Sequence, residues 1–260
     1  MAHKLTEKRS FNPTTLALSS GAIEIIKWLA LIAMTLDHTN KILLNARFSW
    51  VYNLGRLAMP LFGFILAYNL ARPNTLKNHT YSSVAIRTFI MGLAATPFYK
   101  AAFHHAGLGS LNIMFTLGLA ACILFLIDKS MQSHNVDLVI ITRALALAAF
   151  MLGSLFVEGQ HIAVGYVLAA WAYCKTQKVW VSLVCLPLLA WVPLLIWLLS
   201  TASLGLINDN AWAVAAIPVI LLTSKINFKL ARLKWMFYVY YPLHLAILIS
   251  MRRCLAINFM

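Results

Sequence analysis

The chain has 260 residues, of which 62% are hydrophobic and only 11% are charged, with a mean hydropathy of +0.80. Soluble domains average about 45–50% apolar and about 25% charged residues, so this composition excludes an ordinary soluble protein. The net charge of +14 does not point to a nucleic-acid partner, because the lysines and arginines fall in short loops between apolar runs, where they set membrane topology. The runs are continuous rather than alternating, which predicts an all-α bundle of transmembrane helices in the lipid bilayer.

In chain order, residues 1–20 are interpreted as a basic cytoplasmic tail and residues 21–260 as one transmembrane domain. Most of the 21 lysines and arginines then fall on the inner side, which predicts a cytoplasmic N-terminus. The sixth and eighth of the expected spans are short for a lipid core about 30 Å thick. We expect nine spans, at about 24–43, 54–71, 83–101, 111–128, 138–156, 161–174, 179–199, 211–224 and 235–251.

Ionisable side chains inside apolar spans are costly in lipid and mark candidate functional sites. In the predicted topology, Asp37, His38 and Arg56 lie near the outer ends of the first two spans, and His244 lies at mid-depth in the last. Neighbours on a helix point about 100° apart, so Asp37 and His38 do not form a dyad with each other. We expect Asp37 to pair with Lys41 or Arg56, and His38 to face the bundle alone or to point toward His244.

The types of these residues indicate acid–base chemistry. His244 lies deep in an apolar span, where a histidine should be neutral near pH 7 and suits a general base, and Pro242 frees a carbonyl near it. Arg56 stays charged and is suited to an oxyanion or a substrate carboxylate. Each also has a structural alternative, such as an ion pair or a hydrogen-bonded buried histidine. No cysteine or histidine spacing supports a metal site. Three polar residues at outer span ends are candidates for binding substrate: Asn112, Glu158 and His161.

Four stretches carry a resemblance to a known family: LALIAMTLDHTNK, LGRLAMPLFGFILAYNLAR, LNIMFTLGLAA and YVYYPLHLAIL. In order and content they resemble the TraX family over almost the whole chain. That family is named for an enzyme that N-acetylates the processed pilin of conjugative F-type pili, and it is similar to the acyltransferase-3 group of membrane acyltransferases. One segment departs from the family: Gln160-His161-Ile162 stands where Asp-Tyr-Gly is expected, with Glu158 as a replacement for the acid. The resemblance marks Asp37, His38, Gly55, Arg56, Pro60, Arg87, Asn112, Pro242 and His244.

The resemblance implies a multi-pass acetyltransferase of the bacterial inner membrane, with acetyl-CoA as donor and a pilin N-terminus or another envelope protein as acceptor. His38 or His244 is then expected to act as general base or to carry the acetyl group transiently. Arg56 and Asn112 are expected to stabilise the oxyanion. Basic residues of the inner loops are expected to contact the donor phosphates: Arg72, Lys77 and Arg87.

Two other classes of function stay open on the residues alone. A proton-coupled transporter or flippase would use Asp37, His38 and His244 as a proton relay. A non-catalytic subunit of a pilus or secretion machine would tolerate alanine at all the buried polar positions.

Overall fold

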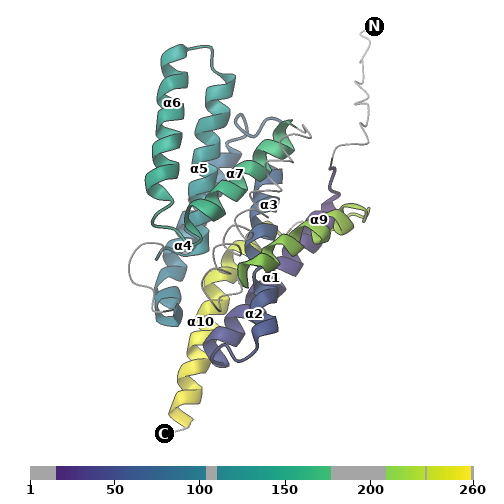
Figure 1. The fold of residues 1–260 in the computed structure, drawn as a ribbon, viewed down its shortest axis with the longest axis vertical. Helices are drawn as coiled ribbons and strands as arrows, with labels where there is room; N and C mark the ends of the chain where they lie inside the picture. The colour runs from purple at the N-terminus through teal and green to yellow at the C-terminus, as the bar shows by residue number, and fades with distance from the viewer. Residues whose placement is uncertain (1–15, 104–109, 177–208, 232, 259–260) are drawn as a thin grey trace, which may run out of the picture.

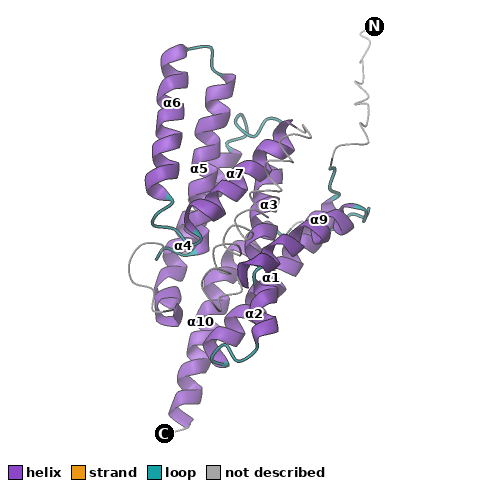
Figure 2. Cartoon of the chain, in the orientation of Figure 1, coloured by secondary structure: helices purple, strands orange, loops and turns teal. Residues whose placement is uncertain are grey.

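The computed structural model describes residues 16–103, 110–176, 209–231 and 233–258. Within these ranges the chain is helical, as predicted, and β pairing is limited to one isolated bridge between Leu111 and Val157. Figure 2 shows the described elements as helices joined by loops. They are α1 (Ser20–Leu43), α2 (Ser49–Gly55), α3 (Ala58–Leu70), α4 (Thr80–Phe103), α5 (Ile113–Gln132), α6 (Val136–Ala148), the π-helix η1 (Ala149–Gly153), α7 (Gln160–Thr176), the 3₁₀ helix η2 (Asp209–Ala215), α9 (Ala216–Ser224) and α10 (Lys234–Asn258).

Among the residues that the structure describes, three helical segments are long and apolar enough to cross a membrane: Ser49–Leu70, Ile113–Gln132 and Val136–Gly153. The predicted spans in the described ranges overlap helices, but the span at 54–71 is interrupted between α2 and α3, and the span at 211–224 is divided between η2 and α9. The predicted span at 179–199 lies outside the described ranges. The number of spans and the cytoplasmic N-terminus stay predictions. Side chains of α6 show the expected membrane character, because large apolar groups point outward at Val136, Ile140, Ile141, Leu145 and Leu147.

The helices pack around two apolar clusters. α4 packs against α5 and α10, α3 packs against α7, and α1 packs against α2, α3 and α10. In Figure 1, α5, α6 and α7 occupy the upper part of the molecule, and α10 (yellow) runs down to the C-terminus. One cluster includes Ile26, Leu61 and Leu70, and the other includes Met34 and Leu245. The second cluster surrounds the polar residues described below.

Helix starts carry the capping residues that local chemistry favours. The side chains of Ser19, Asn112 and Asn135 each accept a backbone hydrogen bond at the start of α1, α5 and α6, and such caps contribute about 1 kcal/mol each. Just before α1, Leu18 is buried and its N–H donates to the Tyr68 hydroxyl at 3.0 Å. The last residues of the predicted tail therefore pack on the bundle, whereas residues 1–15 lie outside the described ranges.

Candidate active site

Two histidines that are 206 residues apart in the sequence meet between α1 and α10. Nδ1 of His38 lies 2.8 Å from Nε2 of His244. Their rings are parallel within 7°, with centroids 5.1 Å apart. Nδ1 of His244 in turn lies 3.0 Å from the backbone carbonyl oxygen of Tyr240. Of the two arrangements open for His38, the structure therefore has the one that points toward His244.

When both rings are neutral, these contacts determine which nitrogen of each histidine carries the hydrogen. A carbonyl oxygen only accepts hydrogen bonds, so Nδ1 of His244 carries the hydrogen and donates to Tyr240. The other nitrogen of His244 then accepts, and Nδ1 of His38 must donate to it. Nε2 of His38 is left with a lone pair, and within the described part of the chain no hydrogen bond reaches it. The pair therefore presents one basic nitrogen, on His38, in a fixed orientation.

The environment of the pair differs in one detail from the sequence expectation. A helical N–H bonds to the carbonyl four residues earlier, so Pro242 inside α10 leaves the Tyr238 carbonyl without its helical donor. The ring of His244 bonds instead to the carbonyl of Tyr240. The Tyr240 ring also stacks on His244 at 5.2 Å, and its hydroxyl lies 2.9 Å from Oγ1 of Thr35 on α1. Two polar links thus join α1 to α10 around the histidines.

Asp37 pairs with both cations that the sequence offered as alternatives. Its Oδ2 accepts from Nζ of Lys41 at 2.7 Å and from Nη2 of Arg56 at 3.2 Å. The carboxylate is almost fully buried, so the two cations offset the cost of removing it from water. Both cations also lie over the ring of Tyr52, at 4.7 and 4.3 Å, and both are within electrostatic reach of His38. The result is a fixed positive cluster beside the histidine pair.

Gly55 lets α2 approach α1 closely enough for this cluster to form. A Cβ atom at Gly55 would lie 2.4 Å from Cβ of Asp37, closer than real Cβ atoms come. The backbone of Gly55 therefore packs directly on the Asp37 side chain. Arg56 follows Gly55 at the end of α2, so this contact also sets where its guanidinium can reach.

Asn112 begins α5, and its side chain is used within the fold. Its Oδ1 accepts from the N–H of Met114 at 3.1 Å, and its Nδ2 donates to the Gly92 carbonyl at 2.9 Å. These bonds cap α5 and clasp it to α4. The predicted contact of Asn112 with substrate would require one of these buried bonds to be given up.

Glu158 lies in the turn between η1 and α7 and reaches the same end of the bundle as the histidines. Its N–H donates to the Leu111 carbonyl at 2.7 Å. Gly159 follows in the left-handed region, with φ at +73°, which favours glycine. The Glu158 carboxylate is hydrogen-bonded by the Tyr99 hydroxyl and lies within electrostatic reach of Lys41. It therefore lies near the positive cluster, although it comes from a distant part of the chain.

His161 is placed differently from the other predicted histidines. Its Nε2 lies 3.0 Å from the carbonyl oxygen of Met151 in η1, and its ring meets the Phe150 ring edge-on at 5.3 Å. A π-helix has a wider turn than an α-helix and leaves carbonyls free for such bonds. Its contacts in the described structure tie His161 to η1 and do not include the histidine pair.

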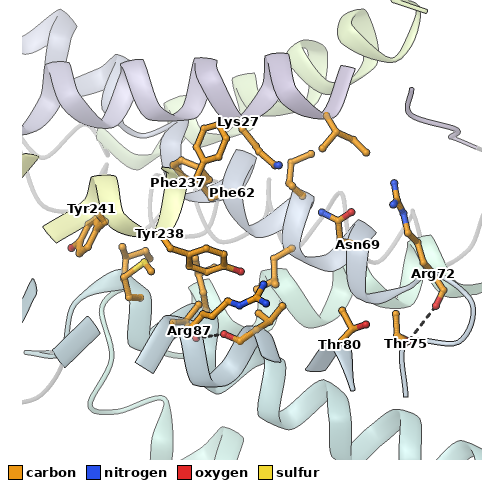
Figure 3. Close-up of a pocket in the computed structure, with 18 of the residues that line it drawn as sticks. Lys27, Phe62, Asn69, Arg72, Thr75, Thr80, Arg87, Phe237, Tyr238 and Tyr241 are labelled. Carbon is orange, nitrogen blue, oxygen red and sulfur yellow. Dashed lines mark hydrogen bonds between the residues drawn. The ribbon is translucent and has the colours of Figure 1, made fainter. Parts of the chain in front are cut away.

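A cavity of about 530 Å³ lies between α1, α3, α4, α5 and α10, within the size range of small-molecule sites. Among the described residues, three cations line it: Lys27, Arg72 and Arg87. Figure 3 shows Arg72 toward one end of this cavity and Tyr241 toward the other. Lys77, which was predicted to act with the two arginines, is exposed and is not among the lining residues.

The two arginines of the cavity are held by aromatic rings. Arg87 lies over the Trp235 ring at 4.8 Å, and Arg72 lies over the Tyr68 ring at 5.3 Å. Neither forms an ion pair with a carboxylate among the residues that the structure describes, whereas Lys27 pairs with Glu24 at 2.7 Å. Guanidinium groups in this state are well suited to hold phosphates.

The far end of the cavity adjoins the histidine pair. The Tyr241 ring lies 5.5 Å from the His244 ring and 6.5 Å from the His38 ring, centroid to centroid. Met34, one helical turn before His38, also lines the cavity. The cavity therefore connects a basic region with the neighbourhood of the candidate base.

A second buried polar cluster, centred on Asp128, was not predicted from the sequence. Asp128 pairs with Lys175 at 3.0 Å and accepts from the Tyr81 hydroxyl at 3.0 Å, and Trp171 donates to that hydroxyl at 3.2 Å. The cluster ties α4, α5 and α7 together. Lys27 and Tyr241 were also not among the predicted site residues, because their types and positions are typical of topology charges and interfacial packing.

Comparison with known proteins agrees with the resemblance seen in the sequence. Protein TraX of Escherichia coli strain K12 is 33% identical over 113 residues, covering 42% of this chain and 41% of that protein. A second Protein TraX of Escherichia coli is 32% identical over 113 residues, with the same shares. The aligned region thus spans about two fifths of these curated relatives. No solved structure matches the chain. The family described as TraX protein matches residues 22–252, nearly the full length, and the chain therefore belongs to the TraX family.

Proposed function

We propose that this chain is an integral-membrane acetyltransferase of the bacterial inner membrane. It takes an acetyl group from acetyl-CoA and passes it to an amine or hydroxyl of an envelope acceptor, the N-terminus of a pilin being the first candidate. The observation that carries the proposal is the hydrogen-bonded pair of His38 and His244, which lies next to Tyr241 at the end of a cavity lined by arginines. Membership of the TraX family supports the same reaction class.

The cations that line the cavity suit the charge of the proposed donor. Acetyl-CoA carries anionic phosphates at one end and a thioester at the other, joined by a largely uncharged arm. Arg72 and Arg87 are suited to hold the phosphates, because neither has a carboxylate partner among the described residues. Apolar side chains such as Phe62 and Leu66 also line the cavity. A thioester at the Tyr241 end would lie next to the histidine pair.

The histidine pair would perform the proton transfer. As the acceptor nitrogen forms its bond to the acetyl carbon, Nε2 of His38 takes the proton that leaves that nitrogen. The positive charge on His38 is then supported by His244, whose Nε2 accepts from His38 and whose Nδ1 donates to Tyr240. When the bond between carbon and sulfur breaks, His38 returns the proton to the departing thiolate. A base placed in this way contributes about 10²–10⁴-fold in rate.

Arg56 would act through its charge. Asp37 and Tyr52 hold its guanidinium in place, and it lies within electrostatic reach of His38. A fixed cation near the reacting carbonyl stabilises the negative charge that develops on oxygen. Lys41, bound to the same carboxylate, adds to this field.

The experiment compares intact masses of membrane and surface proteins from cells with and without this chain. A shift of one acetyl group on one protein would support the proposal and identify the acceptor. His38→Ala and His244→Ala should each abolish the shift while the amount of the chain in the membrane stays unchanged. Full acetylation in both variants would contradict the histidine mechanism.

The same variants separate the other two classes of function. A transporter or flippase would lose flux in His38→Ala, and the wild-type chain would yield no acetylated product. A non-catalytic assembly subunit would support pilus or secretion function with alanine at each buried polar position.

A further inference from the structure

Tyr241 has a buried hydroxyl that the fold does not use. The side chain is 3% exposed, and within the described part of the chain its hydroxyl makes no hydrogen bond of ordinary geometry. Leaving such a group unpaired costs about 1–3 kcal/mol. Other buried tyrosines are satisfied: Tyr166 donates to the Pro60 carbonyl at 3.0 Å, and Tyr81 bonds to Asp128 at 3.0 Å. The hydroxyl of Tyr241 thus keeps a hydrogen available to a bound molecule.

Tyr241 lies where the proposed donor site meets the proposed base. It lines the cavity, at the end away from Arg72 in Figure 3. Its ring is also in contact range of the rings of His244 and His38. A carbonyl held at this end of the cavity, and attacked by a nucleophile activated at His38, would lie close to Tyr241.

The N-terminus of α5 lies near the Tyr241 hydroxyl and favours negative charge there. Ile113, the first residue of α5, also lines the cavity, and its backbone amide lies close to the Tyr241 hydroxyl oxygen. The Asn112 side chain satisfies the next N–H of the helix, whereas the first N–H of a helix has no intrahelical partner. The positive end of the helix dipole stabilises negative charge nearby. A developing oxyanion would meet both a hydroxyl donor and this helix terminus.

We propose that the Tyr241 hydroxyl donates a hydrogen bond to the acetyl carbonyl oxygen of the donor thioester. When the acceptor nitrogen bonds to the acetyl carbon, the carbonyl π electrons move to oxygen, and Tyr241 stabilises that oxyanion while keeping its own proton. The electrons return as the bond between carbon and sulfur breaks. This inference rests on the acetyl transfer proposed above. Asn112 was expected to donate to the oxyanion, but its side chain is already bonded to Gly92 and Met114. Tyr241 would take that role instead.

The test removes the hydroxyl and keeps the ring. Because the hydroxyl makes no hydrogen bond of ordinary geometry in the described structure, Tyr241→Phe should leave the melting temperature of the full chain in detergent nearly unchanged. It should lower kcat by roughly 10²–10³-fold, with the KM for acetyl-CoA little changed. The matched control is Tyr166→Phe, which loses a buried bond to the Pro60 carbonyl. That variant should have a lower melting temperature and wild-type kcat.

The outcomes separate this inference from the proposed function. Wild-type kcat in Tyr241→Phe, with transfer abolished in His38→Ala, would overturn the role of Tyr241 and leave the acetyltransferase proposal intact. Faster transfer in Tyr241→Ala than in Tyr241→Phe would identify a steric gate and also overturn the hydroxyl role. A lower melting temperature that accounts for the lost activity of Tyr241→Phe would do the same. If the wild-type chain transfers no acetyl group, the proposed function fails and this inference fails with it.

Discussion

Nδ1 of His38 lies 2.8 Å from Nε2 of His244, and this single hydrogen bond gives the two rings different chemical positions. His244 is fixed between His38 and the carbonyl oxygen of Tyr240. His38 is bonded to His244 through one nitrogen, and within the described residues its other nitrogen makes no hydrogen bond. His244 orients the ring of His38, and His38 accepts the proton. These two roles require α1 and α10 to pack together, because each helix supplies only one of the rings.

The first prediction uses this asymmetry. In His244→Gln, the amide oxygen can still accept from Nδ1 of His38, so the base keeps part of its orientation and activity should fall modestly. In His38→Gln no base remains, and activity should fall about 10²–10⁴-fold. Acetyl transfer measured at equal amounts of membrane-inserted protein checks the order. Equal losses in the two variants would contradict the assigned roles.

The second prediction concerns the buried carboxylate of Asp37. Asp37→Ala leaves Lys41 and Arg56 facing each other without their shared counterion. Breaking a buried ion pair in this way costs about 3–5 kcal/mol, so the melting temperature in detergent should fall strongly. Arg56→Ala keeps the bond from Lys41 to Asp37 at 2.7 Å and should be less destabilising. A milder effect of Asp37→Ala than of Arg56→Ala would argue against this account.

The third prediction compares two glycines. Gly55→Ala would place a Cβ 2.4 Å from that of Asp37, whereas at Gly165 on α7 the nearest atoms, in the Phe150 ring, are 3.8 and 3.9 Å away. Gly55→Ala should therefore separate α2 from α1 and lower both stability and activity. Gly165→Ala should be neutral or stabilise the helix by roughly 0.5–1 kcal/mol. Thermal unfolding in detergent, with activity measured in parallel, tests the pair, and equal tolerance at both sites is the contrary result.

The fourth prediction tests where the donor binds. Arg72→Ala and Arg87→Ala each remove a cavity guanidinium and should raise the KM for acetyl-CoA more than they lower kcat. Lys77→Ala provides the comparison, because Lys77 is exposed and does not line the cavity. Its KM should stay at the wild-type value. An increase in KM for Lys77→Ala alone would favour the loop rather than the cavity as the phosphate site.

Sequence reasoning succeeded where the spacing along one helix decides the contact. Lys41 follows Asp37 by four residues, one helical turn, so their ion pair at 2.7 Å is a local consequence of helix geometry. The helical class follows from long apolar runs, because lipid offers no hydrogen bonds to an unpaired backbone. His38 and His244 are predictable as site residues for a similarly local reason, because polar groups in apolar segments are costly.

Only the tertiary structure decided which of these groups meet. His38 faces His244. His161 instead bonds to the Met151 carbonyl, in a π-helix that no sequence pattern predicted. Tyr241 is indistinguishable in sequence from its neighbouring tyrosines, yet only the packing of α10 against α1 and α4 brings it to the cavity. The physical reason is that helices in lipid are apolar on all sides. The pattern of apolar residues along such a helix therefore does not show which face packs against another helix. Side-chain shape and close contacts such as that at Gly55 select the partners once all the helices are assembled.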